Sequence, residues 1–354
     1  MAGGKGAETA SRQGTRAAGR PMKTPDDDGE QAVVTAAAAC DAVSGRDRRE
    51  GDAGGGEREA RVALERLEAV LAPLPSVCVA FSGGVDSSLV LAAAARRLGA
   101  ARVLGFTASS ETYRSAELVE ARAFAGALGV RHVVHQTREL DDERFAANPP
   151  ERCYYCKGAM LEAMAEAARA AGIETLADGA NRDDLGDVRP GLQRAAEHGV
   201  LHPLIVAGLG KADVRAVSRR LGLPTAAKPQ QACLASRLPY GSEITAEKLR
   251  VIAAAEDVLR ELGFGQSRVR HHGDIARIEV EASEIGRAAG GPVRDELVRR
   301  LRALGFTYVT LDLQGFRSGS MNEAPRAAAS AETTTRAGSA GAPGAASAGA
   351  ATTK

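Results

Sequence analysis

A glycine-rich loop between an apolar strand and a helix constrains this chain more than any other segment. The loop spans residues 82–88 (SGGVDSS), follows the apolar run Val77–Phe81 and leads into a helical pattern over Leu89–Arg97. A helix that begins directly after such a loop presents unpaired backbone N–H groups and the positive end of its dipole. The order strand, loop, helix therefore predicts a phosphate-binding site.

The loop offers several groups that suit a nucleotide. Its glycines let an anion approach the backbone closely, and its serines add hydroxyl donors. Asp86 is an acid beside an anion site, which makes sense if Mg²⁺ lies between them. The spacing is not that of a Walker loop, and the alternative is a Gly-Ser turn without a ligand. The order of elements favours phosphate binding by Ser82, Gly83, Gly84, Asp86, Ser87 and Ser88.

Strand and helix patterns alternate through the first two thirds of the chain, which predicts an α/β fold with a doubly wound parallel sheet. The expected strands are 77–81, 103–106, 132–134 and 175–177, and the expected helices are 58–71, 89–98, 116–128, 160–171 and 211–221. The later pattern (helix 245–262, strand and turn within 267–280, helix 293–304, strand 308–313) predicts a smaller α+β domain.

Composition marks the domain boundaries. Residues 1–57 and 323–354 are rich in Ala, Gly and small polar residues without sustained periodicity, and we expect disordered tails there. Between them we expect a nucleotide-binding domain over 58–230 and the small α+β domain over 231–322. The hinge is expected in the proline-marked stretch 224–239.

Charge and hydropathy exclude several classes of protein. The 354 residues carry a formal net charge of +1, which argues against a protein that holds nucleic acid by bulk electrostatics. No apolar run reaches the ~18 residues of a membrane span, and the N-terminus does not read as a secretory signal. We therefore expect a cytoplasmic location and cysteines that are not disulfide-bonded. Cys78 reads as a buried hydrophobe and Cys40 as a tail residue without a role.

Three further cysteines stand where a thiol can react or bind metal. Cys153 and Cys156 form a CxxC pair shortly before an expected helix, a position that favours thiolates. Cys233 lies on a loop near Arg237, which favours a reactive thiol over a structural one.

The residues alone leave three chemistries open for these thiols. A [4Fe–4S] cluster held by three thiolates leaves one iron open, which could carry a sulfide. A dithiol couple needs only Cys153 and Cys156 and leaves Cys233 unexplained. A structural Zn²⁺ needs four ligands, and His198 and His202 are possible without being required by spacing.

Two arginines alternate along an expected strand after residue 267. Arg268 and Arg270 share one face, and two guanidinium groups on one face suit a phosphate. The alternative is a solvated strand face, which the local sequence favours.

The loop 82–88 resembles the pyrophosphate (PP) loop of the N-type ATP pyrophosphatases, and further motifs in order resemble the LarE family of ATP-dependent sulfur transferases. The motifs lie within about 60–322, at 82–88, 152–157, 178–184, 211–215, 233–237, 268–274 and 315–322. The resemblance implies the adenine nucleotide alpha hydrolase-like fold, ATP as cosubstrate and Mg²⁺ held by Asp86. It also implies homo-oligomers.

The resemblance implies a reaction in nickel-pincer nucleotide biosynthesis. The substrate would be pyridinium-3,5-biscarboxylic acid mononucleotide, whose carboxylates are adenylated and then converted to thiocarboxylates. Sulfur would come either from a sacrificed cysteine at Cys233 or from a sulfide on a [4Fe–4S] cluster held by Cys153, Cys156 and Cys233. The presence of all three cysteines fits the cluster branch, in which a sulfur donor system could recharge the enzyme.

The resemblance also assigns roles to residues outside the loop. Asp178 and Asn181, which follow the fourth expected strand, and Arg237 would help to bind the cofactor. Arg268 and Arg270 would bind a phosphate of the substrate or of pyrophosphate. Glu256 is expected to face outward from the long helix at 245–262, with a metal or nucleotide role by analogy alone.

Three other functions compete with this interpretation. A PP-loop tRNA thiolase needs a basic, aromatic surface, against which the near-neutral charge and the 3% of aromatic residues count. An ammonia-dependent synthetase leaves three cysteines without a role. A non-catalytic nucleotide-binding redox sensor does not require the intact loop with Asp86.

Overall fold

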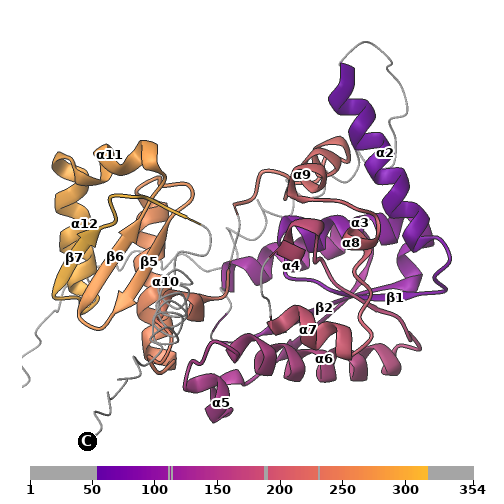
Figure 1. Cartoon of the computed structure of the whole chain (residues 1–354), viewed down its shortest axis with the longest axis horizontal. Coiled ribbons are helices and arrows are strands. Elements are labelled where there is room, and N and C mark those ends of the chain that lie inside the picture. Colours follow the sequence, from indigo (N-terminus) through magenta and orange to yellow (C-terminus); the bar gives the residue numbers. More distant parts are fainter. Residues whose placement is uncertain (1–53, 111, 113–114, 187–189, 230–231, 318–354) are drawn as a thin grey trace, which may run out of the picture.

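The structure is a computed structural model that describes residues 54–110, 112, 115–186, 190–229 and 232–317 (Figure 1). Its first part contains α2 (Gly54–Leu71), β1 (Val77–Ala80), α3 (Val85–Leu98), β2 (Val103–Ser109), α4 (Ser115–Ala127), β3 (Arg131–Gln136), α5 (Glu143–Ala146), α6 (Arg152–Ala170), β4 (Leu176–Ala177), α7 (Pro190–Glu197), α8 (Pro203–Val206) and α9 (Lys211–Arg220). Its second part contains α10 (Ala246–Glu261), β5 (Arg268–His272), β6 (Ile275–Glu279), α11 (Ile285–Ala289), α12 (Gly291–Ala303) and β7 (Tyr308–Leu311).

The four strands of the first part form one parallel sheet in the order β3-β2-β1-β4. The chain builds the sheet outward from β1 to β3 and then returns to add β4 on the other side of β1. This is the doubly wound topology that the alternating pattern predicted, and the predicted fold class is confirmed. The reversal of strand order lies between β1 and β4, where open α/β sheets bind their ligands.

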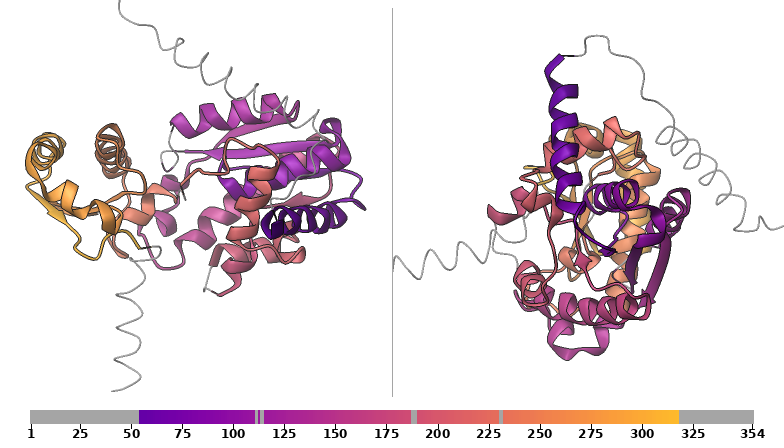
Figure 2. Two further views of the ribbon diagram at one scale, coloured as in Figure 1. Left: turned by 90° about the horizontal axis from the view of Figure 1, so that it is seen from above. Right: turned by 90° about the vertical axis from the view of Figure 1, so that its right-hand side faces the viewer.

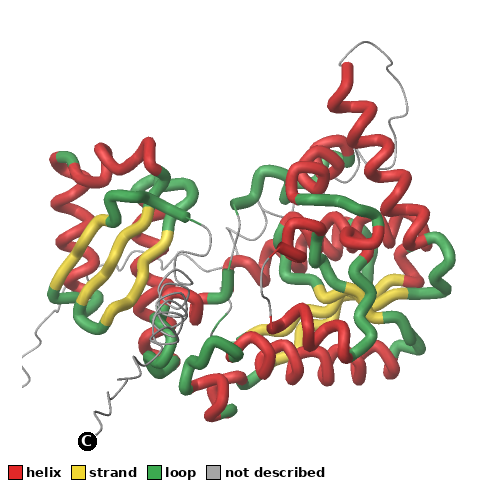
Figure 3. The backbone as a smooth tube through the Cα atoms, in the orientation of Figure 1, coloured by secondary structure: helices red, strands yellow, loops and turns green. Residues whose placement is uncertain are grey.

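Helices cover both faces of this sheet (Figures 1 and 3). Successive side chains of β1 point to opposite faces: Val77 and Val79 pack with α2, α3, α4 and α9, while Cys78 packs with α6 and α7. A strand with both faces buried reads as a continuous apolar run. That explains why the sequence 77–81 is uniformly hydrophobic.

The second part forms a separate three-stranded sheet in the order β5-β6-β7. β5 and β6 are an antiparallel hairpin that turns at Gly273, whose φ is 62°, and β7 pairs parallel with β6. The helices α10, α11 and α12 pack on this sheet, and the two sheets lie in different lobes (Figure 2).

The structure corrects the predicted start of three helices. Helix α3 begins at Val85, four residues before the expected start at 89. Helix α2 begins at Gly54, inside the expected tail 1–57, and α6 begins at Arg152, eight residues before the expected start at 160. Cys153 and Cys156 therefore lie within the first turns of α6 and not before it. The rest of the two expected tails lies outside the described residues, and so do residues 318–322 at the end of the expected second domain.

The expected boundary between 230 and 231 and the hinge within 224–239 stay predictions. A small apolar cluster connects the two parts, with Phe145 of α5 and Leu234 packing together with Leu249 and Ile252 of α10. No helix among the described residues is long and apolar enough to cross a membrane.

Candidate active site

The loop after β1 closes tightly around the start of α3. Gly83 has a φ of 69°, a left-handed conformation that glycine adopts without strain, and Gly84 precedes the first residue of α3 in an extended conformation. The backbone N–H of Ser82 donates to Ser87 Oγ at 3.2 Å, and Ser87 Oγ donates to the Gly84 carbonyl at 3.2 Å. These contacts hold the loop at the positive end of the α3 dipole, as an anion site requires.

Ser88, the last residue of the predicted phosphate-binding loop, is packed inside the protein. Ser88 is fully buried, and its hydroxyl has no hydrogen-bond partner among the described residues. Phosphate binding by Ser88 stays a prediction.

Two side chains from distant segments converge on Asp86 in the first turn of α3. Lys211, the first residue of α9, forms an ion pair with the Asp86 carboxylate. Asn181 Nδ2 donates to Asp86 Oδ1 at 3.2 Å. A third side chain reaches the loop itself, since Lys228 Nζ donates to the carbonyl of Gly83 at 3.1 Å. The structure thus brings Asp86 and Asn181 together, and it adds two lysines that suit a polyphosphate.

Gly179 lets the segment after β4 approach the phosphate loop. A Cβ atom at this position would lie 2.7 Å from the backbone nitrogen of Ser87, which is closer than packed atoms allow. The backbone after β4 and the first turn of α3 therefore touch directly, and only glycine permits this.

We expect Gly179→Ala to weaken ATP binding by about tenfold or more, because the new methyl group must displace the first turn of α3. Isothermal titration with ATP and Mg²⁺ measures the effect. Gly186→Ala is the matched control, since a Cβ at Gly186 meets nothing within 4 Å. Equal affinities of the two variants would contradict the close approach.

Asp178, directly after β4, links the phosphate loop region to the cysteines. Its carboxylate accepts from Lys157 Nζ at 3.2 Å and contacts His202 Nδ1 at 2.7 Å. Burial would raise the pKa of Asp178, but the His202 hydrogen bond and the Lys157 charge outweigh it and lower the pKa to about 2. The carboxylate is therefore ionised at neutral pH. Lys157 directly follows Cys156, so this ion pair joins the first turns of α6 to the carboxyl end of β4.

The three predicted cysteines lie close enough to influence one another. All are free thiols; Cys153 and Cys233 are exposed and Cys156 is half-buried. Burial raises the pKa of Cys156 well above its usual value, and the charges of Cys233 and Glu139 raise it further. Although the Cys233 residue as a whole is exposed, the protein around its sulfur raises the pKa of the thiol, and the charge of Cys153 adds to this rise.

Hydrogen bonds fix the loop that carries Cys233. The Cys233 sulfur accepts from the backbone of Ala235 and from the side chain of Thr112, and both bonds lower its pKa against the effect of desolvation. The backbone N–H of Leu234 donates to the Thr112 carbonyl at 3.3 Å. Thr112 follows the carboxyl end of β2, so Cys233 is anchored at the same edge of the sheet as the phosphate loop.

Arg237 and Glu256 form a buried clamp beneath this loop. The Arg237 guanidinium makes two hydrogen bonds to the Glu256 carboxylate, at 2.8 and 3.0 Å, and donates to the carbonyls of Ala232 and Cys233. Arg237 is 1% exposed and Glu256 is 4% exposed. The expectation that Glu256 faces outward is wrong, because its carboxylate is turned in to meet this arginine. Arg237 contacts the loop that carries Cys233, and cofactor binding by Arg237 stays a prediction.

We expect Glu256→Ala to lower the free energy of unfolding by about 3–5 kcal/mol, because it leaves the buried Arg237 charge without its partner. Chemical denaturation measures the loss. Glu261→Ala on the same helix is the matched control: its pair with Arg300 is exposed, and such pairs are worth about 0–1 kcal/mol. Similar losses in both variants would contradict the clamp.

The two arginines of β5 share a face as predicted, but both are engaged within the protein. Arg270 pairs with the buried Glu279 at 2.8 Å and donates to the Ser236 carbonyl at 2.9 Å. Arg268 donates to the Ser267 carbonyl and lies over the Phe316 ring. Phosphate binding by Arg268 and Arg270 stays a prediction. It requires each guanidinium group to contact the phosphate as well as the protein groups that it already contacts.

Lys157, Lys211 and Lys228 were missed as site residues. Lys157 and Lys211 fall inside motifs that carry the family resemblance. The sequence therefore marked these two positions but did not indicate what the lysines contact. Lys228 lies five residues before Cys233 with no motif of its own. Each meets its partner through a long-range contact, which local sequence patterns do not contain.

The site suits a magnesium ion that arrives with its nucleotide. Mg²⁺ is commonly held by one or two carboxylates together with substrate phosphates, and Asp86 lies where phosphates are expected. Within the described ranges, no group of three or more His, Cys, Asp or Glu side chains is placed to hold a metal ion. This gives no support to the zinc alternative.

An iron–sulfur cluster on the three cysteines stays a prediction. Cys153, Cys156 and Cys233 are unpaired and interact electrostatically.

Comparisons with known proteins agree with this geometry. A protein-family model described as asparagine synthase matches residues 71–169, which include the phosphate loop and the CxxC pair. The pyridinium-3,5-bisthiocarboxylic acid mononucleotide synthase of Lactiplantibacillus plantarum is 40% identical over 73% of this chain and 92% of its own length. An uncharacterized protein of Synechocystis is 43% identical over 73% of this chain and 96% of its own length. An uncharacterized protein of Methanocaldococcus jannaschii is 30% identical over 50% of this chain and 68% of its own length.

Proposed function

Because the chain belongs to the LarE-like family of ATP-pyrophosphatase enzymes, we propose that it inserts sulfur into pyridinium-3,5-biscarboxylic acid mononucleotide. Each cycle consumes one ATP: a substrate carboxylate attacks the α-phosphate, pyrophosphate leaves, and sulfur then displaces AMP to give a thiocarboxylate. A second cycle converts the other carboxylate. The name of the Lactiplantibacillus relative describes the product of such a reaction.

One observation carries the proposal: the phosphate loop and the three thiols are joined at one edge of the sheet. Lys157 of the cysteine-bearing helix pairs with Asp178, and Asn181 of the same segment as Asp178 bonds to Asp86. An enzyme that only splits ATP does not need thiols there. A sulfur transferase needs an activated acyl group and a sulfur atom within reach of each other.

The first half-reaction follows from the charges around the loop. The α3 N-terminus and the lysines at positions 211 and 228 stabilise the negative charge that builds up on the leaving pyrophosphate. Asp86 would hold Mg²⁺, which would neutralise part of the phosphate charge. Adenylation gives the carboxylate a good leaving group, which it otherwise lacks.

We propose a cluster on Cys153, Cys156 and Cys233 as the sulfur source. When bound, a [4Fe–4S] cluster with one open iron supplies a sulfide that can be replaced between turnovers. The alternative source is Cys233 itself: its sulfur attacks the acyl group, AMP leaves, and elimination across the Cα–Cβ bond leaves the thiocarboxylate and dehydroalanine. Arg237 serves both routes as a positioning residue, because it fixes the backbone of Cys233.

The proposed substrate is tested by acceptor-dependent pyrophosphate release. We expect the pyridinium mononucleotide to stimulate release from ATP, while tRNA or ammonium ions leave it at the background rate. Stimulation by tRNA would favour the thiolase, and stimulation by ammonium the synthetase. Nucleotide binding without release under any condition would favour a redox sensor.

The sulfur source is tested by anaerobic reconstitution with iron and sulfide. We expect visible absorption and bound iron that are lost in Cys153→Ser, Cys156→Ser and Cys233→Ser, and kept in Cys40→Ser. Absence of the chromophore, together with loss of the mass of H₂S from Cys233 after turnover, would assign the sacrificial route. Light scattering of the reconstituted protein tests the homo-oligomer that we also propose.

A further inference from the structure

Asn148 lies where the helix that carries Cys153 and Cys156 meets the segment that follows Cys233. It stands between α5 and α6 and is fully buried. Its φ is 56°, and among the described residues it is the only residue other than glycine with a positive φ. Residues in such sparsely populated conformations persist only where their surroundings hold them, and they gather at functional sites. The contacts of Asn148 therefore call for a functional reason.

The side-chain amide of Asn148 reaches across to the turn that follows the Cys233 loop. Its Nδ2 donates to the carbonyl of Pro239 at 2.7 Å and to the carbonyl of Ser242 at 2.8 Å. The backbone carbonyl of Asn148 accepts from the N–H of Gly241 at 2.9 Å. Both donors of the amide are thus used on one turn, and a single buried side chain joins two segments that are far apart in the sequence.

The other end of the same amide holds the start of α6. Asn148 Oδ1 accepts from Arg152 Nη1 at 2.8 Å, and Arg152 Cζ lies 4.6 Å from the centre of the Tyr240 ring. Arg152 is buried and directly precedes Cys153. Desolvation raises the pKa of Cys233 and the Arg152 charge opposes this rise. The Arg152 guanidinium is therefore within electrostatic reach of the third thiol.

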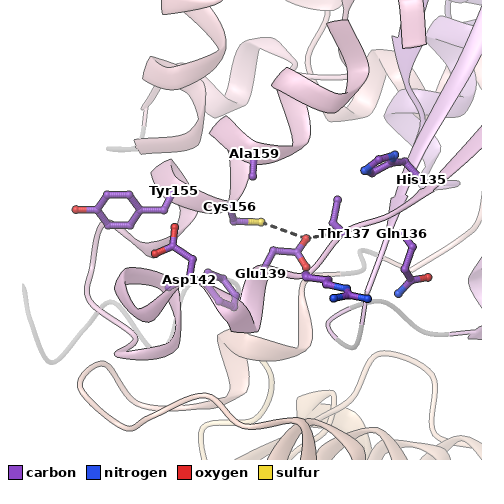
Figure 4. A pocket seen from close by; sticks show the side chains of 10 residues that line it. His135, Gln136, Thr137, Glu139, Asp142, Tyr155, Cys156 and Ala159 are labelled. Atoms are coloured by element: carbon purple, nitrogen blue, oxygen red, sulfur yellow. Dashed lines mark hydrogen bonds between the residues drawn. The ribbon is translucent and has the colours of Figure 1, made fainter. Parts of the chain in front are cut away.

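The three cysteines depend on different parts of the chain for their positions. The Cys156 thiol donates to Glu139 Oε1 at 3.9 Å, in the turn after β3 (Figure 4). The loop with Cys233 is tied to the end of β2 through Thr112, as described above. Asn148 ties the far end of that loop to α6, the helix of the other two cysteines.

We propose that Asn148 is a positioning residue that sets the spacing between the two cysteines of α6 and Cys233. One planar amide holds Arg152 with its oxygen and the turn after the Cys233 loop with its nitrogen, so the two cysteine-bearing segments cannot move apart without breaking its hydrogen bonds. The spacing itself stands on these contacts. Its use in sulfur transfer rests on the proposed function, in which the three thiols act together.

The spacing is tested by cross-linking the reduced, metal-free, full-length chain with dibromobimane. A cysteine thiolate displaces one bromide of the reagent. The second bromide is displaced either by another cysteine of the same chain or by 2-mercaptoethanol, which is present at a fixed concentration. The ratio of the two products gives the effective concentration of the second cysteine. Peptide mass spectrometry separates the cross-segment bridge (Cys153–Cys233) from the local bridge (Cys153–Cys156).

We expect Asn148→Gly to lower the effective concentration of the cross-segment bridge by about tenfold, as the loss of two hydrogen bonds allows. The local bridge should be unchanged, because its two cysteines lie on one helix. Glycine adopts the positive φ without strain, so the variant removes the amide alone. Arg287→Ala is the matched control: it also removes two hydrogen bonds to backbone carbonyls, within the second part of the chain, and it should change neither bridge.

A cross-segment bridge that forms as readily in folded Asn148→Gly as in the unmodified protein would overturn the proposal. Asn148→Asp, which keeps the acceptor for Arg152 and loses both N–H donors, makes the same test if the glycine variant does not fold. The unmodified protein needs no variant: its cross-segment bridge should form at least about tenfold more readily when folded than in concentrated urea, and equal values would overturn the proposal.

Pyrophosphate release is measured on the same preparations, so that the two proposals can fail separately. An unchanged cross-segment bridge in Asn148→Gly, with mononucleotide-dependent release, removes the positioning role and keeps the proposed function. A lowered bridge in Asn148→Gly, without such release even in the unmodified protein, keeps the positioning role and removes the proposed function.

Discussion

Replacing Cys233 with alanine is expected to abolish sulfur transfer while ATP still binds. Both proposed routes need this sulfur, either as a cluster ligand or as the atom that is transferred, so we expect a loss on the order of 10³-fold or more. Hydrogen bonds from Ala235 and Thr112, which lie outside the loop 82–88, act on the Cys233 sulfur. Product formation is followed by mass spectrometry and ATP affinity by isothermal titration.

Cys40→Ala is the control for loss of a thiol as such, and we expect it to keep full activity. Full activity of Cys233→Ala would contradict both sulfur routes at once. Loss of ATP binding together with loss of activity would show instead that the substitution disturbs the loop that Thr112 anchors.

Replacing Asp86 with asparagine is expected to remove Mg²⁺-dependent pyrophosphate release, with a loss of about 10²–10³-fold. The amide keeps the shape of the side chain, but it gives up the charge that would hold the metal against the phosphates. It also ends the ion pair with Lys211. Continuous assay of pyrophosphate over a range of Mg²⁺ concentrations measures the effect.

Glu166→Gln, which removes an exposed carboxylate from α6, is the control for a change of charge alone and should release pyrophosphate at the normal rate. Release by Asp86→Asn at that same rate would mean that the loop after β1 does not bind a metal–nucleotide complex.

The sequence predicted the part of the fold that local patterns determine. Uniformly apolar runs such as 77–81 become strands buried on both faces, and glycines such as Gly99 follow the ends of helices. Because the carboxyl ends of parallel strands share one edge, the loop after β1 and Asp178 after β4 were expected together. The structure brings them into contact through Gly179 and Asn181.

What the sequence could not predict depends on partners that are distant in the chain. The spacing of Glu256 along its helix did not reveal that Arg237 reaches it from a preceding loop, so a buried carboxylate was taken for an outward one. Glu139 drew no attention, because only the fold shows that Cys156 lies against it. The early start of α6 was missed because Pro149 and Pro150 and two tyrosines obscure its first turns.

We propose that this chain replaces oxygen by sulfur on a pyridinium mononucleotide at the expense of ATP. The most direct measurement incubates the anaerobically reconstituted protein with ATP, Mg²⁺ and pyridinium-3,5-biscarboxylic acid mononucleotide and resolves the products by mass spectrometry. We expect mononucleotides in which one and then two oxygens are replaced by sulfur, with one AMP and one pyrophosphate per sulfur. Cleavage of ATP to AMP and pyrophosphate with no sulfur in the mononucleotide would contradict the account.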